Sequence, residues 1–217
     1  MNKPYRYVLM DLDGTITDPM PGITRCVEYA LNHFGIRVDS LEDLCCFIGP
    51  PLLDSFREYY GFSEEQAQEA ILKYRERFAT TGMYENVVYP GMEELLQKFH
   101  AAGKEVLVAT SKPEMFARRI LEHFRLADYF TFIGGATLDG TRSHKEEVIR
   151  YVLESCRISR PTGVVMVGDR KYDIEGAKVV GLESIGVLYG YGSREELEKA
   201  GATGIVGSVE ELGNILL

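Results

Sequence analysis

The stretch VLMDLDGTITD, residues 8–18, decides how the rest of the chain is interpreted. It places Asp11, Asp13 and Asp18 within eight positions, directly after an apolar run that is typical of a core strand. A chain that leaves a core strand usually turns and becomes solvated, and Asp-x-Asp-Gly taken alone most often marks such a turn. Crowded carboxylates indicate a functional site only if other polar residues meet them, so the other strand ends decide between the two interpretations.

The chain around this stretch alternates short apolar runs with amphipathic helical patterns. The runs are rich in Val, Ile, Leu, Met or Phe and cover residues 7–12, 105–110, 130–134, 163–168, 184–188 and 204–206. Such runs are typical of parallel strands covered on both faces. Near the carboxyl end, Ser193 with Glu196 and Ser208 with Glu211 have the spacing of helix-opening capping boxes. We therefore predict an α/β fold with a doubly wound, Rossmann-like parallel sheet.

Residues 16–86 depart from this alternation and contain helical patterns but no convincing strand. One pattern ends at Gly35, a second at Gly61, and a third opens at Ser63, where Gln66 would complete a capping box. We expect residues 16–86 to be an inserted helical domain, while residues 1–15 and 87–217 form the core. The insert leaves the core just after the acid-rich stretch, so its two connections are placed to act as a hinge.

Composition narrows the class of protein. The chain has 217 residues, 45% of them hydrophobic and 26% charged, which suits a globular protein with a sizeable core. Without a long apolar segment or a signal-peptide pattern, we expect a cytoplasmic protein with no membrane partner. Its four cysteines form no C-x-x-C pair, which argues against a disulfide framework or a zinc site. A net charge of -9 with no basic patch argues against a nucleic acid polymer as partner.

Polar side chains follow several of the predicted strands, at the carboxyl ends where open α/β sheets bind ligands. They are Asp11, Asp13, Thr110, Ser111, Asp169 and Asp173. Two carboxylates about 4 Å apart repel by about 4 kcal/mol at an effective dielectric near 20, so a cation should lie among the four acids. Oxygen ligands with few nitrogen or sulfur groups suit Mg²⁺, which also binds phosphate. The sequence predicts a magnesium site formed by Asp11, Asp13, Asp169 and Asp173.

Four segments of the chain resemble the successive motifs of the haloacid dehalogenase superfamily. They are DLDGTITD, LVATSKP, the lysine in RSHKEEVI, and VGDRKYD, and their order and spacing cover the whole chain. The 16–86 insert resembles the small helical cap of that family. The chain as a whole is similar to phosphoglycolate phosphatase-like and 5′-nucleotidase-like members, which implies a phosphoric monoester hydrolase.

The resemblance also implies a role for each motif residue. It makes Asp11 the nucleophile, Asp13 the acid/base, Thr110 a donor to a phosphate oxygen, and Lys145 the neutralising charge, with Asp169 and Asp173 at the magnesium. The source of positive charge stays open, because Arg142, Lys145 and Lys171 are all plausible.

The chemistry fits these residues independently. A carboxylate such as Asp11 can attack phosphorus and form an aspartyl phosphate, which splits one difficult displacement into two easier ones. Asp13 would protonate the leaving alkoxide and later activate water, which requires a raised pKa of the kind that like-charged neighbours produce. The charge on the transferring phosphoryl group can be met by Mg²⁺, Thr110, Lys145 and the turn at Gly14.

Further substrate contacts are expected from the loops that face this chemistry. The core offers Ser111 and Lys112, although Ser111 with Glu114 also has the spacing of a capping box. The insert offers Arg25, Arg57 and the stretch FIGPPL, which contains Phe47 and Gly49 and resembles the family's cap loop. Closure of a cap favours a small phosphorylated metabolite as substrate. We expect a monomer or a weak homodimer.

Two other functions stay open. A receiver-type signalling module also holds an acidic cluster, a Ser or Thr and a Lys on a doubly wound sheet, but the helical insert and the Asp-x-Asp spacing argue against it. A sugar-phosphate mutase of the beta-phosphoglucomutase type would use the same acids and return the phosphoryl group to its substrate. Phosphate release would separate the phosphatase from both alternatives.

Overall fold

The protein forms two compact units in a computed structural model that describes residues 5–160 and 162–217. The core unit is Met1–Asp18 with Val88–Leu217, and the helical unit is Pro19–Val87. The insert expected at residues 16–86 overlaps the helical unit, and its role as a cap stays a prediction. Each unit has its own hydrophobic interior, so each is described by itself.

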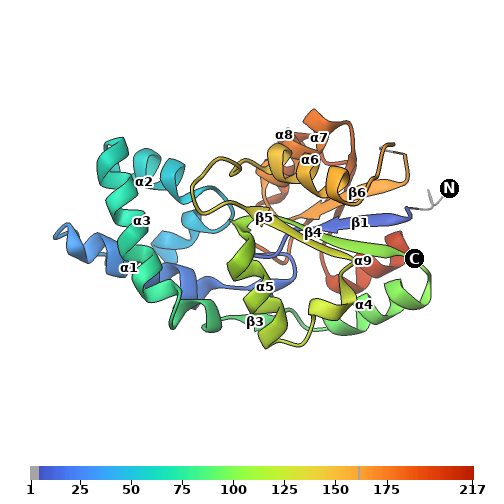
Figure 1. Cartoon of the computed structure of the whole chain (residues 1–217), viewed down its shortest axis with the longest axis horizontal. Coiled ribbons are helices and arrows are strands. Elements are labelled where there is room, and N and C mark those ends of the chain that lie inside the picture. The colour runs from blue at the N-terminus through green and yellow to red at the C-terminus, as the bar shows by residue number, and fades with distance from the viewer. Residues whose placement is uncertain (1–4, 161) are drawn as a thin grey trace. The chain divides into compact units, whose positions relative to one another are not determined.

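The core unit is built on a six-stranded sheet with the order β5-β4-β1-β6-β7-β8 (Figure 1). Its strands are β1 (Tyr7–Met10), β4 (Glu105–Pro113), β5 (Phe132–Ala136), β6 (Val164–Gly168), β7 (Glu183–Val187) and β8 (Gly204–Val206). All the neighbouring pairs are parallel, which confirms the predicted sheet. The chain builds outward from β1 through β4 to β5 and then crosses to β6, so strand order reverses at β1. Ligands of open sheets bind at such a reversal.

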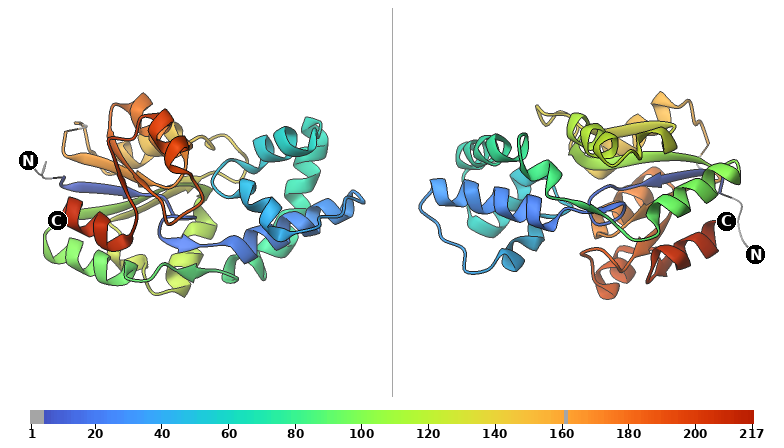
Figure 2. Two further views of the ribbon diagram at one scale, coloured as in Figure 1. Left: turned by 180° about the vertical axis from the view of Figure 1, so that it is seen from behind. Right: turned by 90° about the horizontal axis from the view of Figure 1, so that it is seen from below.

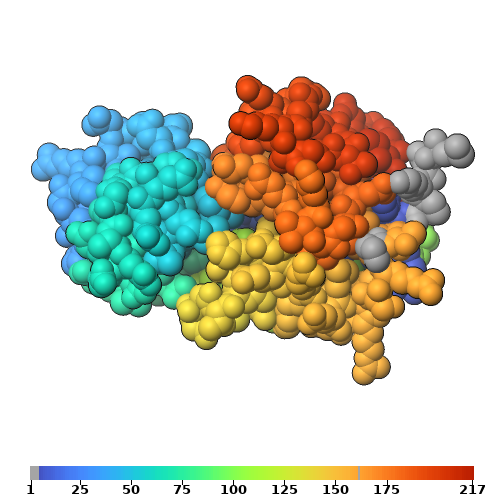
Figure 3. All heavy atoms as spheres, turned by 90° about the horizontal axis from the view of Figure 1, so that it is seen from above, coloured from blue at the N-terminus to red at the C-terminus, as the bar shows by residue number. Residues whose placement is uncertain are grey.

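Helices cover both faces of this sheet (Figures 1 and 2). They are α4 (Met92–Ala101), α5 (Glu114–His123), α6 (Lys145–Ser155), α7 (Lys171–Val180), α8 (Arg194–Ala200) and α9 (Val209–Leu216). Alternate strand residues such as Leu9 and Leu107 face α6 and α7, where they pack on Val148 and Ala177. Figure 1 shows α4, α5 and α9 on the opposite side of the sheet. In the space-filling view of Figure 3, the orange and red atoms of the carboxyl-terminal part of the chain form one continuous region of the core unit's surface.

The helical unit contains α1 (Met20–His33), η1 (Leu41–Phe47), α2 (Leu52–Tyr60), α3 (Glu64–Phe78) and η2 (Gly82–Tyr84). The predicted capping box opens α3, because Ser63 Oγ accepts from the Gln66 N–H at 3.2 Å while Gln66 Oε1 accepts from the Ser63 N–H at 3.0 Å. One prediction for residues 16–86 was wrong: Thr17–Asp18 forms a short strand, β2, which pairs with β3 (Val87–Val88). Two residues are too few to produce a recognisable alternation.

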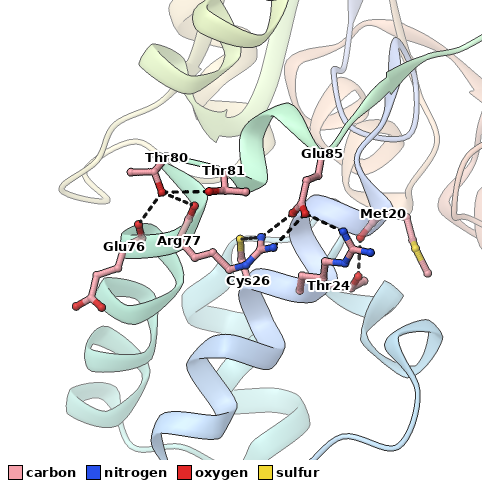
Figure 4. A network of polar contacts seen from close by, with 9 residues as sticks. Met20, Thr24, Cys26, Glu76, Arg77, Thr80, Thr81 and Glu85 are labelled. Atoms are coloured by element: carbon pink, nitrogen blue, oxygen red, sulfur yellow. Dashed lines mark hydrogen bonds and ion pairs between the residues drawn. The ribbon is translucent and has the colours of Figure 1, made fainter.

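An ion-pair network connects the first helix of the helical unit with the last residues of that unit (Figure 4). The Glu85 carboxylate, just beyond η2, accepts from Arg77 Nη1 of α3 at 2.6 Å and from Arg25 Nη1 of α1 at 2.7 Å. The same Arg77 nitrogen lies 3.4 Å from the buried Cys26 sulfur. Arg25, considered above as a substrate contact, therefore forms an ion pair within its own unit.

Two expectations from composition can be compared with the described residues. No helix in the described part of the chain combines the length and apolar character needed to cross a membrane. Among the residues that the structure describes, Cys26, Cys45, Cys46 and Cys156 form no disulfide.

Candidate active site

Three acids from separate elements meet at the carboxyl edge of the sheet, beside the strand-order reversal. Asp11 follows β1, Asp169 follows β6, and Asp173 lies in the first turn of α7. Each offers a carboxylate oxygen within 4.8 Å of the others, and their exposed fractions are 3%, 0% and 1%. We call these residues the acid trio. Three buried carboxylates this close repel one another unless a cation lies among them, as the sequence predicts.

Close backbone packing fixes the trio in place. The Asp11 N–H donates to Val167 O of β6 at 2.9 Å, which joins the end of β1 to the neighbouring strand. Asp173 Oδ2 accepts from the Arg170 N–H at 3.1 Å and so caps α7. A Cβ on Gly168 would overlap the Asp173 side chain, and a Cβ on Gly14 would overlap the Asp169 carboxylate. Only glycine therefore fits at positions 14 and 168.

Lys145, the first residue of α6, points its ammonium group into the trio. Its Nζ lies 2.9 Å from Asp11 Oδ1, 2.8 Å from Asp173 Oδ1 and 3.0 Å from Ala109 O. Burial alone would lower the pKa of Lys145, but the charges of Asp11 and Asp173 raise it above its ordinary value, so the side chain stays cationic. Gly176 of α7 makes room for the lysine stem, since a Cβ there would come within 2.9 Å of Lys145 Cβ.

The other two candidate cations lie elsewhere in the core unit. Arg142 Nε donates to Gly135 O at 2.9 Å, and its guanidinium stacks 3.5 Å above the Tyr151 ring. Lys171 Nζ lies 5.2 Å from the centre of the Tyr172 ring. Of the three residues that the sequence left open, Lys145 is the one that contacts the acid trio.

Asp13 is paired with a cation of its own. Lys112 Nζ lies 2.5 Å from Asp13 Oδ2, and the two side chains are 5% and 9% exposed. Burial raises the pKa of Asp13, the Lys112 charge opposes that rise, and the charge of Asp11 adds to it, so the net shift is upward. This is the direction that a general acid needs. The Asp13 carboxylate is not a member of the acid trio, although the sequence predicts it as a magnesium ligand.

The carboxylate oxygens of the acid trio are suited to bind a divalent cation. Asp169 Oδ1 is buried and has no hydrogen-bond partner in the described chain, and a buried charged group without a partner is costly. Burial, followed by the charges of Asp173 and Asp11, raises the pKa of Asp169 well above its usual range. Burial likewise raises the pKa of Asp173 to about 6 against the opposing effect of Lys145. A hard cation bound to Asp11, Asp169 and Asp173 would satisfy these carboxylates.

The end of β4 differs from the prediction. Thr110 is buried, and its Oγ1 accepts from the Lys112 N–H at 3.2 Å. The proposed capping box of Ser111 with Glu114 is wrong: β4 continues through Ser111 to Pro113, and α5 begins without a side-chain cap. The strand extends this far because Pro113 still pairs with Ala136 of β5 after a register shift. Ser111 is therefore half-buried at the strand end and not at a helix start.

The candidates from the insert lie in the helical unit. Phe47 is 2% exposed, and its ring packs against Phe56 at a centroid distance of 5.0 Å. Gly49 has a φ of 109°, a left-handed conformation that suits the expected break in the chain. Arg57 lines a surface pocket together with Asp54, Glu58, Gly61 and Phe62. Arg57 therefore faces a surface pocket, whereas Phe47 belongs to the unit's aromatic interior.

The loop after β7 also contacts the acid trio, and the sequence patterns above did not predict this. The loop after β7 carries Tyr189, Gly190, Tyr191 and Gly192, and the Tyr191 N–H donates to Asp169 Oδ2 at 2.7 Å. A Tyr-Gly-Tyr-Gly run directly after a predicted strand, at the sheet edge where the acids lie, was the available signal.

The chain is similar to proteins of one family. The family model described as haloacid dehalogenase-like hydrolase matches residues 8–187. A protein named 5′-nucleotidase from Pseudomonas aeruginosa is 50% identical over 193 residues, which cover 89% of this chain and 87% of the relative. One named tyrosine-protein kinase PtkA from Mycobacterium tuberculosis is 37% identical over 211 residues, 96% of this chain and 72% of the relative. The crystal structure of a "predicted phosphatase" from Clostridium acetobutylicum has 54% identity and a TM-score of 0.96 and covers 97% of both chains.

Proposed function

Because the chain belongs to the haloacid dehalogenase-like hydrolase family and is a phosphatase of that family, we propose that it hydrolyses small phosphomonoesters, nucleoside 5′-monophosphates above all, through an aspartyl phosphate on Asp11. The observation that carries the proposal is the buried Asp11, whose carboxylate shares the Lys145 ammonium with Asp173. Membership of a hydrolase family rules out the non-enzymatic receiver module.

In the first step, an Asp11 carboxylate oxygen attacks phosphorus, and the bond from phosphorus to the ester oxygen breaks. Asp13 gives its proton to the leaving alkoxide, a task that matches its raised pKa. Lys145 offsets negative charge beside the attacking carboxylate, and the hydroxyl of Thr110 can donate to a phosphoryl oxygen. Mg²⁺ held by Asp11, Asp169 and Asp173 would supply further neutralisation of the phosphoryl oxygens.

In the second step, water attacks the aspartyl phosphate. Asp13, now ionised, accepts a proton from that water, and the bond between phosphorus and the Asp11 oxygen breaks to release inorganic phosphate. Lys112 keeps a positive charge beside Asp13 while Asp13 is ionised. The two acids thus take separate roles because their surroundings differ: Asp11 faces Lys145, and Asp13 faces Lys112.

The substrate class follows from sequence similarity and chain organisation. The 50% identical relative is named for nucleotide hydrolysis, which supports a nucleoside monophosphate as substrate. The chain passes into the helical unit directly after the acid-rich stretch, which ends at Asp18, and returns to the core unit at Val88. We assign the helical unit the role of a cap that closes on a small ligand, with Arg57 as a candidate contact for the part of the substrate remote from phosphate.

The test is phosphate release in the presence of Mg²⁺ from a panel of esters. The panel contains nucleoside 5′-monophosphates, 2-phosphoglycolate, glucose 1-phosphate, p-nitrophenyl phosphate and a phosphotyrosine peptide. We expect the highest kcat/KM for a nucleoside 5′-monophosphate and the lowest for the peptide. No phosphate release from any ester, or a clear preference for the peptide, would contradict the proposal.

Two further readouts separate other reactions of the same acids. Conversion of a sugar phosphate without phosphate release would identify the mutase alternative. Transfer of phosphate from ATP to a tyrosine peptide would identify the activity that the name of the mycobacterial relative describes.

A further inference from the structure

The loop of residues 189–192 contacts the acid trio through Asp169. The Tyr191 N–H donates to Asp169 Oδ2 at 2.7 Å, and the other oxygen of that carboxylate, Oδ1, has no hydrogen-bond partner in the described chain. The amide therefore holds one oxygen of Asp169 and leaves the second available to a cation. Because a backbone N–H makes this contact, its geometry depends on where the loop lies.

The side chain of the same residue fixes the loop at a second point. The Tyr191 hydroxyl donates to Asp18 Oδ1, and Asp18 ends β2, the last element before the helical unit. Tyr191 thus connects Asp169 through its backbone and Asp18 through its phenol. All three residues belong to the core unit.

The neighbours of Tyr191 allow this close approach. A Cβ on Gly190 would overlap both Gly14 O and the Asp169 side chain, and a Cβ on Gly192 would overlap the Asp169 carbonyl oxygen. The loop can lie against Asp169 only because these two positions have no side chain.

Tyr189 anchors the other end of the loop. Its hydroxyl donates to Thr15 O at 3.2 Å, and its ring packs edge-on against Tyr89 at a centroid distance of 4.9 Å. Tyr89 follows β3, where the chain returns to the core unit. The two tyrosines therefore reach both points at which the core chain is interrupted.

We propose that Tyr191 is a positioning residue for metal binding: its phenol, anchored on Asp18, holds the loop so that its amide orients the Asp169 carboxylate toward the cation site. The inference rests on the metal site of the proposed function and adds to it a residue outside the four motifs. Groups that orient a metal ligand commonly change metal affinity by roughly tenfold or more when removed.

The experiment measures Mg²⁺ binding by isothermal titration calorimetry on the full chain, without substrate. Tyr191→Phe removes the hydroxyl and keeps both the ring and the amide. We expect a dissociation constant roughly tenfold higher than that of the wild type. Tyr129→Phe, which removes an exposed phenol that bonds to Gln97, is the matched control and should leave the constant unchanged.

A double-mutant cycle with Asp18→Ala tests the anchor itself. The loss of the Asp18 charge occurs in both arms of the cycle and cancels, so the coupling term reports the hydroxyl–carboxylate contact. We expect Tyr191→Phe to have almost no further effect once Asp18 is Ala. Unchanged Mg²⁺ affinity in a folded Tyr191→Phe variant, or additive effects in the cycle, would overturn the inference.

Metal affinity and catalysis are measured separately here. A chain that binds Mg²⁺ tenfold more weakly as Tyr191→Phe, yet hydrolyses none of the esters, would support the positioning role and contradict the proposed substrate class. If the wild type and Tyr191→Phe both hydrolyse nucleotides and bind Mg²⁺ with the same affinity, the proposed substrate class is supported and the positioning role of Tyr191 is contradicted.

Discussion

Lys112 Nζ lies 2.5 Å from Asp13 Oδ2, and neither side chain is more than 9% exposed. The two residues are 99 positions apart in the chain, at the ends of adjacent strands β4 and β1. A buried ion pair contributes little net stability, but the loss of one partner leaves the other charge buried and uncompensated. The pair is therefore more sensitive to change than its position at the sheet edge suggests.

Lys112→Met should lower the free energy of unfolding by about 3 to 5 kcal/mol, because the Asp13 carboxylate loses its counter-ion in a buried setting. Urea denaturation at pH 7 measures the loss. The matched control is Arg6→Gln, which breaks the exposed pair of Arg6 with Glu105 and should produce no measurable change. Equal changes in the free energy of unfolding for the two substitutions would contradict this expectation for the buried Asp13–Lys112 pair.

Asp11→Asn should reduce hydrolysis more than about a thousandfold, because an amide of the same shape cannot attack phosphorus. The measurement is phosphate release with Mg²⁺, alongside circular dichroism to confirm that the variant is folded. Near-wild-type turnover by a folded variant would mean that Asp11 is not the nucleophile.

Asp13→Asn should slow hydrolysis by about 10² to 10⁴-fold for an alkyl phosphate, whose leaving group needs a proton. The loss should be smaller for p-nitrophenyl phosphate, since nitrophenolate leaves without protonation. The check is kcat/KM across esters whose leaving groups span a wide range of pKa. An equal loss for every ester would argue against a role as general acid.

The Arg77–Glu85 pair should make the helical unit sensitive to acid. Hydrogen bonding from Arg77, and then from Arg25, lowers the pKa of Glu85 in the folded protein. A carboxyl whose pKa is lowered by folding stabilises the fold above its unfolded pKa of about 4.3, and this contribution is lost as pH falls through the folded pKa. Glu85→Gln should therefore lower the free energy of unfolding by about 1 kcal/mol at pH 7, and by less at pH 3.5. Urea curves at both pH values test this, and a difference that does not shrink in acid would contradict it.

Phe47 and Arg57, both expected to contact substrate, should behave differently from each other. Phe47→Ala should destabilise the helical unit by about 3 to 5 kcal/mol, because it removes a buried ring that packs on Phe56. Arg57→Ala, at a surface pocket, should change KM and the ranking of substrates while leaving stability nearly intact. The pair of measurements is a thermal melt and a substrate panel. A change of substrate ranking with Phe47→Ala alone would assign specificity to the aromatic interior.

Much of this molecule could be predicted from local pattern. Apolar runs and helix-capping residues depend on neighbours a few positions away, so the six strands of the core sheet and the start of α3 at Ser63 were predicted correctly. The edge at which the acids lie could also be predicted, because the carboxyl ends of parallel strands share one side of a sheet.

Tertiary partners account for what could not be predicted. Ser193 Oγ accepts from the Glu196 N–H as the capping spacing implied, but the Glu196 carboxylate bonds to Arg170 Nε at 3.0 Å and to the Lys171 N–H at 2.8 Å. The Lys112–Asp13 pair likewise joins residues that no sequence period relates. A spacing rule identifies the residues able to form a local bond, whereas the fold decides which distant group competes for it.

The glycines around Asp169 determine which positions near the acid trio can accept a substitution. Gly14, Gly190 and Gly192 surround Asp169, and Gly168 lies against Asp173, so the walls behind two of the acids are main chain and have no space for any side chain. In a saturation library selected for function, these four positions would accept almost no replacement, although none of them carries a reactive group. A scan that ranks positions by loss of function would therefore place them beside Asp11, and only a parallel measurement of folded protein would distinguish a spacer from a reactant.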